Sequence, residues 1–178
     1  ASVASFFLSR IDVMVDPLLE EIEGRGGPDA ERAAALKGKI AVANAKLAYQ
    51  AYKEIFGSKR FGELAQSGAR TQRLLWASTG TKNPSYSDTM YVEPLIGRDT
   101  VNTMPVETLD AYRDHGEPAA DRIEEGVEEA RQQLETLNAL RIDLDEVTAK
   151  LEEEGVDKFI KPFDSLMATL EAAAQPTD

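Results

Sequence analysis

The chain opens on a short, nearly continuous apolar run over residues 1–8, which ends in Ser9 and Arg10. A run of this length without polar alternation is typical of a strand buried on both faces, as in a parallel sheet, although a buried helix can have the same pattern. Two more short apolar runs, at residues 73–77 and 100–104, are followed by polar loop residues or proline. The pattern therefore predicts three short strands far apart in the chain.

Apolar residues at helical spacing predict four helices before residue 116. They cover residues 16–24, 29–56, 88–96 and 106–114. Asp16 would cap the first of them, with Pro17 in its first turn. Strands that alternate with helices in this way are typical of βα units around a parallel sheet.

The pattern of apolar residues predicts helices in the remainder of the chain, residues 117–178. Apolar stripes run from Ile123 to Leu137 and from Phe159 to Leu170. Asp143, with Glu146 three residues later, forms a capping-box pattern at the start of another helix. We therefore expect an α/β segment over residues 1–116 and a helical segment over residues 117–178.

Composition restricts the classes of protein to which the chain can belong. Its 178 residues suit a single domain of modest size. The absence of cysteine excludes disulfides, thiolate zinc sites and cysteine catalysis, and the single His115 excludes a multi-histidine metal site built from this chain alone. We expect His115 to contact carbonyl groups at a helix end. No apolar stretch approaches the length of a membrane span, and no leader pattern is present, so a soluble cytoplasmic protein is expected.

The charge is concentrated in the last two fifths of the chain. Residues 1–106 carry 13 Lys and Arg against 12 Asp and Glu, whereas residues 107–178 carry 7 against 20. A net charge of −13 on the second part argues against binding to nucleic acid. A solvated face on acidic helices explains it, and a non-catalytic interaction protein that docks a basic partner through this part is the alternative.

Polar and basic side chains gather where the predicted strands end. Ser9 and Arg10 follow the first strand, and Ser78 and Lys82 follow the second. In parallel α/β folds the chemistry lies at these carboxyl ends. An arginine fork, a lysine and hydroxyl groups together suit a phosphate, although surface solubility explains such residues more often than not.

Four separated motifs carry a resemblance to a known family. They are SFFLSR at 5–10, GKIAVANAKLAY at 38–49, LWASTGTKNP at 75–84 and VNTMP at 101–105. In this order they resemble the bacterial transaldolases, most closely the longer bacterial type. The likeness covers residues 1 to about 116, and the acidic helical tail is compatible with it.

The resemblance implies a (β/α)₈ barrel and a set of phosphate-binding residues. Ser5, Phe7 and Arg10 match the family's S-x-F-x-x-R motif, in which the arginine binds the phosphate and the other two line the pocket. Ser78 matches the serine of the next strand. Shorter transaldolases have an arginine two residues after that serine; this chain has Gly80 there, and Lys82 is the expected substitute.

The implied reaction moves a dihydroxyacetone unit from a ketose phosphate, such as fructose 6-phosphate or sedoheptulose 7-phosphate, to an aldose phosphate. It belongs to the pentose phosphate pathway and proceeds through a lysine Schiff base, with carboxylates and a water for the protons and with no metal or organic cofactor.

Nothing in the chain resembles the strand that carries the family's lysine, and 178 residues fall short of the roughly 250 of a closed barrel. We therefore expect the last three βα units of a barrel plus the C-terminal helices, and a chain that is inert alone. The missing barrel half would be supplied in cis or in trans. A homodimer could otherwise cover the open sheet edges.

Overall fold

The computed structural model describes residues 2–174. The chain divides into two compact units, Ala1–Ile142 and Asp143–Asp178, and each is described by itself. Among the described residues, no helix is both long enough and apolar enough to cross a membrane.

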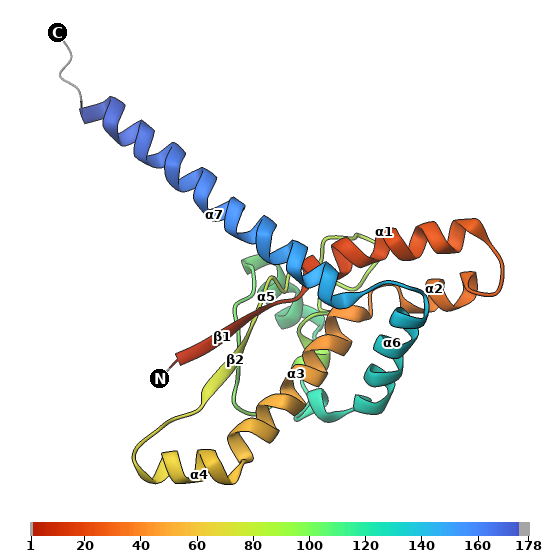
Figure 1. Ribbon diagram of the computed structural model, residues 1–178, viewed down its shortest axis with the longest axis horizontal. Coiled ribbons are helices and arrows are strands. Elements are labelled where there is room, and N and C mark those ends of the chain that lie inside the picture. Colours follow the sequence, from red (N-terminus) through yellow and green to blue (C-terminus); the bar gives the residue numbers. More distant parts are fainter. Residues whose placement is uncertain (1, 175–178) are drawn as a thin grey trace. The chain divides into compact units, whose positions relative to one another are not determined.

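A parallel sheet of three strands forms the centre of the first unit (Figure 1). The strands are β1 (Ser2–Phe7), β2 (Gln72–Ala77) and β3 (Thr100–Asn102), in that spatial order. Phe6 lies opposite Trp76 in the register, and their rings meet edge to face at 5.7 Å on one face of the sheet. On the other face, Val3 and Phe7 remain about two fifths exposed, at 39% and 41%. All three predicted strands are confirmed, as is the α/β class.

Helix α1 (Ser9–Arg25) begins directly after β1. The prediction that a helix starts at Asp16 was therefore wrong, and Pro17 lies inside the helix. The buried side chains of Ile11, Val15 and Leu19 recur every four residues. This apolar stripe continues the helix through the proline, because the burial it provides outweighs the loss of one backbone hydrogen bond.

The long helix predicted over residues 29–56 is two helices, α2 (Ala30–Leu36) and α3 (Ile40–Gly57). The break lies at Gly38, whose φ of +68° is left-handed. The carboxylate of Asp16 on α1 accepts a hydrogen bond of 2.9 Å from the Gly38 N–H. A contact from outside the segment thus holds the chain in a turn within an alanine-rich sequence that favours a continuous helix.

Replacing Gly38 by alanine is expected to lower the free energy of unfolding by about 2 kcal/mol, since a side chain in the left-handed region costs 1–2 kcal/mol. The new Cβ would also lie 2.9 Å from the ring of Tyr86. Gly24→Ala is the matched control, because a Cβ there meets nothing within 4 Å and Gly24 lies within α1. Thermal or urea unfolding checks both variants; equal stability of the two would contradict the prediction.

Helix α4 (Lys59–Gln66), which the sequence pattern missed, follows α3 after a single residue. That residue is Ser58, whose extended backbone ends α3 and whose hydroxyl accepts a hydrogen bond from Phe61 N at 3.2 Å. The serine is a helix N-cap, and this signal was present in the sequence.

Between β2 and β3 the structure has turns and one short 3₁₀ helix, η1 (Glu93–Leu95). The helix predicted over residues 88–96 is therefore wrong. Pro94 in this segment lacks an N–H and disfavours a helical conformation in the residue before it. Tyr91, Val92 and Leu95 are nevertheless buried, so burial rather than helical periodicity explains the apolar residues there.

Helix α5 (Val106–His115) follows β3 and confirms the predicted helix there. His115 at its end contacts carboxylates instead of the expected carbonyls. Its Nε2 lies 2.9 Å from Asp88 Oδ1 and its Nδ1 3.2 Å from Asp114 Oδ2. These two hydrogen bonds raise the pKa of the exposed imidazole.

The first unit ends with the short helix η2 (Arg122–Glu124) and helix α6 (Val127–Ala139), which packs along α3. Lys53 near the end of α3 pairs with Glu124 at 2.6 Å, and Lys46 donates to the carbonyl of Glu125 at 2.5 Å. The start of α6 thus lies beside the middle of α3.

The second unit is helix α7 (Leu144–Ala174), with Pro162 inside it. Asp143 accepts a hydrogen bond of 2.8 Å from Asp145 N, so the aspartate of the predicted capping box does contact the first turn. Seven apolar side chains from residue 156 onward are at least two fifths exposed. They are Val156, Phe159, Ile160, Phe163, Leu166, Met167 and Leu170.

Candidate functional site

The carboxyl ends of the three strands meet at one edge of the sheet, and backbone pairing continues past them. Leu8 N donates to Ala77 O at 3.0 Å, and Ser9 N donates to Ser78 O at 3.1 Å. On the other side, Thr103 N donates to Trp76 O at 2.9 Å. The residues that follow each strand are therefore held in fixed positions relative to one another.

Arg10 and Phe7 form a unit at the junction of β1 and α1. The guanidinium carbon of Arg10 lies 4.8 Å from the centroid of the Phe7 ring. A cation over an aromatic face is attracted by the ring's quadrupole, and a stacked guanidinium keeps the edge that carries its N–H groups free. Ser5 is exposed on the same face of β1 as Phe7, two residues earlier. The structure thus brings Ser5, Phe7 and Arg10 to one end and one face of the first strand.

Ser78 follows β2 and is joined to this group through Ser9. The hydroxyl oxygens of Ser9 and Ser78 are 2.9 Å apart. Ser78 has a φ of +56°, which is uncommon for a residue with a side chain, and it is half-buried. A cation and a hydroxyl donor therefore come from adjacent strand ends, as the sequence predicted.

Thr79 links the end of β2 to the end of β3. Its side chain is fully buried, and its hydroxyl lies 3.1 Å from Asn102 Oδ1 and 3.3 Å from the carbonyl oxygen of Thr103, both of which accept. It fixes the backbone on one side of Ser78 and has no exposed atom with which to reach a ligand.

Lys82 lies elsewhere. Its exposed side chain lines a surface pocket of about 310 Å³ together with three carboxylate residues of α1 and two phenols. These neighbours are Asp12, Asp16, Glu20, Tyr86 and Tyr91. None of the contacts within residues 2–174 joins Lys82 to Arg10 or Ser78. Carboxylates of α1, rather than the strand-end hydroxyls, share this pocket with the lysine.

Two aspartates of α1 tie this loop to the rest of the unit. Asp12 accepts hydrogen bonds from Tyr91 Oη at 2.9 Å and from Ala41 N at 2.8 Å. One turn later, Asp16 accepts from Tyr86 Oη at 2.8 Å. Each carboxylate therefore joins the loop after β2 to the start of α3, and we call these four side chains the Asp–Tyr clasp.

Asp12 is the most perturbed carboxyl group of the clasp. It is 1% exposed, and burial raises its pKa to about 6 from 3.8, against the opposing effect of the hydrogen bonds from Ala41 and Tyr91. Burial and the neighbouring Asp12 also raise the pKa of the Tyr91 phenol, which stays protonated and donates. Ala41 lies in the first turn of α3, so Asp12 accepts from a backbone N–H at the start of that helix. Tyr91 as its partner was missed, because 79 residues separate the two.

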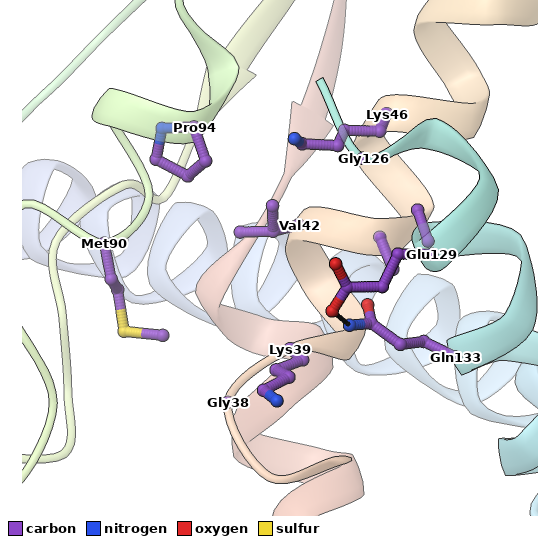
Figure 2. A pocket seen from close by; sticks show the side chains of 11 residues that line it. Gly38, Lys39, Val42, Lys46, Met90, Pro94, Gly126, Glu129 and Gln133 are labelled. Carbon is purple, nitrogen blue, oxygen red and sulfur yellow. Dashed lines mark hydrogen bonds between the residues drawn. The ribbon is translucent and has the colours of Figure 1, made fainter. Parts of the chain in front are cut away.

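A second pocket, of about 270 Å³, lies between α3 and α6 and is shown in Figure 2. Lys39, which directly precedes α3, and Lys46 of α3 line it, with Glu129 and Gln133 of α6, whose side chains hydrogen-bond at 3.0 Å. Lys46 donates to two backbone carbonyls, and desolvation lowers the pKa of its ammonium group. None of the five predicted site residues lines this pocket.

Among residues 2–174, no three His, Cys, Asp or Glu side chains are grouped closely enough to hold a metal ion. The chemistry available at the strand ends is therefore that of a guanidinium, an aromatic face and hydroxyl groups. Donors of these kinds suit an oxyanion such as a phosphate group.

The chain is similar to proteins named transaldolase. The sequence profile of the transaldolase/fructose-6-phosphate aldolase family matches residues 1–170. A protein named transaldolase 2 from Nostoc sp. is 53% identical over 176 residues, which cover 96% of this chain and 46% of the relative. The transaldolases of Saccharopolyspora erythraea and Trichodesmium erythraeum are each 51% identical, over 96% of this chain and 44% and 46% of their own lengths. The chain thus spans about half the length of these curated relatives.

Proposed function

Because the chain belongs to the transaldolase/fructose-6-phosphate aldolase family, we propose that residues 1–178 form the phosphate-binding part of a transaldolase. The enzyme would transfer a dihydroxyacetone unit between sugar phosphates of the fructose 6-phosphate and sedoheptulose 7-phosphate class. Its place in the pentose phosphate pathway and in the cytoplasm is part of the same proposal.

Two contacts at adjacent strand ends carry this proposal above the others: Arg10 stacks on Phe7, and the hydroxyl of Ser9, the residue before Arg10, pairs with that of Ser78. The Arg10 fork would bind two phosphate oxygens, and the Ser78 hydroxyl would donate to a third. Ser5 and Phe7 would line the pocket on the side of the sugar. Lys82 is the weakest member of the set, because carboxylates of α1 share its pocket.

The parallel sheet with its exposed face supports a partial barrel. In a (β/α)₈ barrel, one face of every strand points into an interior that is filled with side chains. The face of β1 that carries Val3 and Phe7 would be that inner face. We propose that residues 1–116 supply the last three βα units and residues 117–178 the C-terminal helices. The lysine that forms the Schiff base, and its acidic partners, would come from the other strands of the barrel, in cis or in trans.

Residues 1–178 by themselves are expected to form no Schiff base. After incubation with fructose 6-phosphate and borohydride, the mass of the chain should be unchanged. A full-length relative, such as the transaldolase 2 of Nostoc sp., is the positive control and should gain a stable adduct. An adduct on this chain would contradict the prediction, and peptide mapping would show whether Lys82 or another lysine carries it.

The transfer activity itself is tested on the gene product that contains these residues. It should move a dihydroxyacetone unit from fructose 6-phosphate to an aldose phosphate without added metal or cofactor. Absence of transfer, with a folded protein and an active control enzyme, would overturn the proposed function.

The exposed apolar row of α7 favours a second candidate function, a non-catalytic helical interaction protein. Native mass spectrometry distinguishes the two. Co-purification with a chain of similar size that carries the lysine strand supports the transaldolase, and so does a single longer polypeptide. A stable complex with a basic protein that lacks such a strand supports the interaction protein, whose acidic helices would dock that partner.

A further inference from the structure

Ser9 is a buried serine between two residues of the proposed phosphate site, Phe7 and Arg10, and the proposal gives it no role so far. It is the first residue of α1 and is 1% exposed. Its N–H donates to the carbonyl of Ser78 at 3.1 Å, and its hydroxyl lies 2.9 Å from that of Ser78. Both polar groups of Ser9 that face β2 are therefore directed at Ser78.

Ser78 has an unfavourable backbone conformation that its neighbours must stabilise. Its left-handed φ of +56° costs on the order of 1–2 kcal/mol for a residue with a Cβ. On its C-terminal side, the fully buried Thr79 is fixed to Asn102 and Thr103. The backbone of Ser78 is thus held from both neighbouring strands, whereas its hydroxyl contacts one group within residues 2–174, the hydroxyl of Ser9.

The direction of this hydrogen bond follows from the ligand. A serine hydroxyl has one proton to donate and can accept two. An ionised phosphate oxygen only accepts, so Ser78 must give its proton to the phosphate and accept from Ser9. The Ser9 hydroxyl can make that donation, since Ser78 is its partner among the described residues. Hydrogen bonds in such a series polarise one another, so the donation from Ser9 strengthens the bond from Ser78 to the phosphate.

We propose that Ser9 is a positioning residue, which holds the Ser78 hydroxyl so that its proton points at the phosphate group of the substrate. This inference rests on the proposed function. The phosphate site then includes a buried residue, Ser9, that does not contact the ligand. The hydrogen bond between the two serines has the function of orienting the Ser78 proton.

The test is Ser9→Ala in the gene product that contains residues 1–178. The KM for fructose 6-phosphate and the inhibition constant of inorganic phosphate should both rise about fivefold, the value of one neutral hydrogen bond. The kcat should stay within twofold, and turnover of unphosphorylated fructose should be unchanged. Ser9→Thr, which keeps the hydroxyl, should restore much of the affinity, and the exposed Ser67→Ala is the control for an unrelated serine.

Parallel variants separate failure of this inference from failure of the proposed function. In a Ser78→Ala background, Ser9→Ala should have no further effect on phosphate affinity. If Ser78→Ala weakens phosphate binding and Ser9→Ala does not, or if Ser9→Ala weakens all substrates alike, the positioning role is overturned and the phosphate site stands. If neither Ser78→Ala nor Arg10→Ala affects sugar phosphates, the proposed function fails. Should Ser9→Ala not fold, Ser9→Cys, of similar shape but a weak donor, gives the same comparison.

Discussion

Replacing Arg10 by alanine is expected to raise the KM of the gene product for fructose 6-phosphate about 100-fold, the largest effect on binding that we foresee. Hydrogen bonds to a charged group contribute about 1.5–3 kcal/mol each, and every 1.4 kcal/mol is tenfold in affinity. The guanidinium would bind a phosphate through two such bonds while stacked on Phe7 at 4.8 Å. Steady-state kinetics with sugar phosphates measures the change.

Arg10→Lys keeps the positive charge but loses the two-pronged guanidinium. Its KM for fructose 6-phosphate should therefore lie between those of the wild type and Arg10→Ala. Arg70→Ala is the matched control, because this exposed arginine lies just before β2, at the opposite end of the strand from Ser78. Turnover of unphosphorylated fructose should change little in any of these variants. An equal loss with Arg10→Ala and Arg70→Ala would show that the effect is not local to the strand ends.

Replacing Asp12 by asparagine is expected to remove a pH dependence of stability. The folded-state pKa of Asp12 is raised from 3.8 to about 6 by burial, so the folded chain binds more protons than the unfolded chain between these values. The free energy of unfolding of the wild type should therefore fall as pH rises from about 4 to about 6, the opposite of the usual carboxylate behaviour. At 1.36 kcal/mol per pKa unit, the loss amounts to about 3 kcal/mol.

The asparagine oxygen can still accept from Ala41 N, and its amide can donate to the Tyr91 oxygen, although the phenol proton then loses its acceptor. The bond to Ala41 is thus kept without the buried charge. The free energy of unfolding of Asp12→Asn, relative to that of the wild type, should therefore be higher at pH 7 than at pH 4. Unfolding by urea at the two pH values measures this difference. Asp110→Asn on the exposed surface of α5 makes the same change of charge and should show no such gain. Parallel pH profiles for wild type and Asp12→Asn would refute the assigned cause.

The positions of the strand-end residues could be predicted from the sequence for a definite reason. Each of the three strands is a compact apolar run, and parallel strands bring their carboxyl ends to one edge whatever the intervening segments do. Ser5, Phe7, Arg10 and Ser78 therefore follow directly from the positions of two strands. Lys82 lies five residues beyond β2, where the path of the loop and not the strand decides its neighbours.

The local pattern of apolar residues did not predict where two of the helical segments break or fail to form. Residues 29–56 have the composition of one helix, and nothing within them requires a break except the permissive Gly38. The break is made by Asp16 and Asp12 of α1, which bind Gly38 N and Ala41 N from 22 and 29 residues away. Residues 88–96 are held in turns by burial and by the bond from Tyr91 to Asp12.

The sequence by itself determined the α/β class, the three parallel strands and the family, because these depend on runs of apolar residues and on motifs that are contiguous in the chain. Only the tertiary structure decided the pairing of Ser9 with Ser78, the surroundings of Lys82 and the Asp–Tyr clasp. The bonds from Ser9 to Ser78, from Tyr86 to Asp16 and from Tyr91 to Asp12 join residues 69, 70 and 79 positions apart. Hydrogen bonds of 2.8–2.9 Å between such distant residues depend on how the elements pack, which no local pattern encodes.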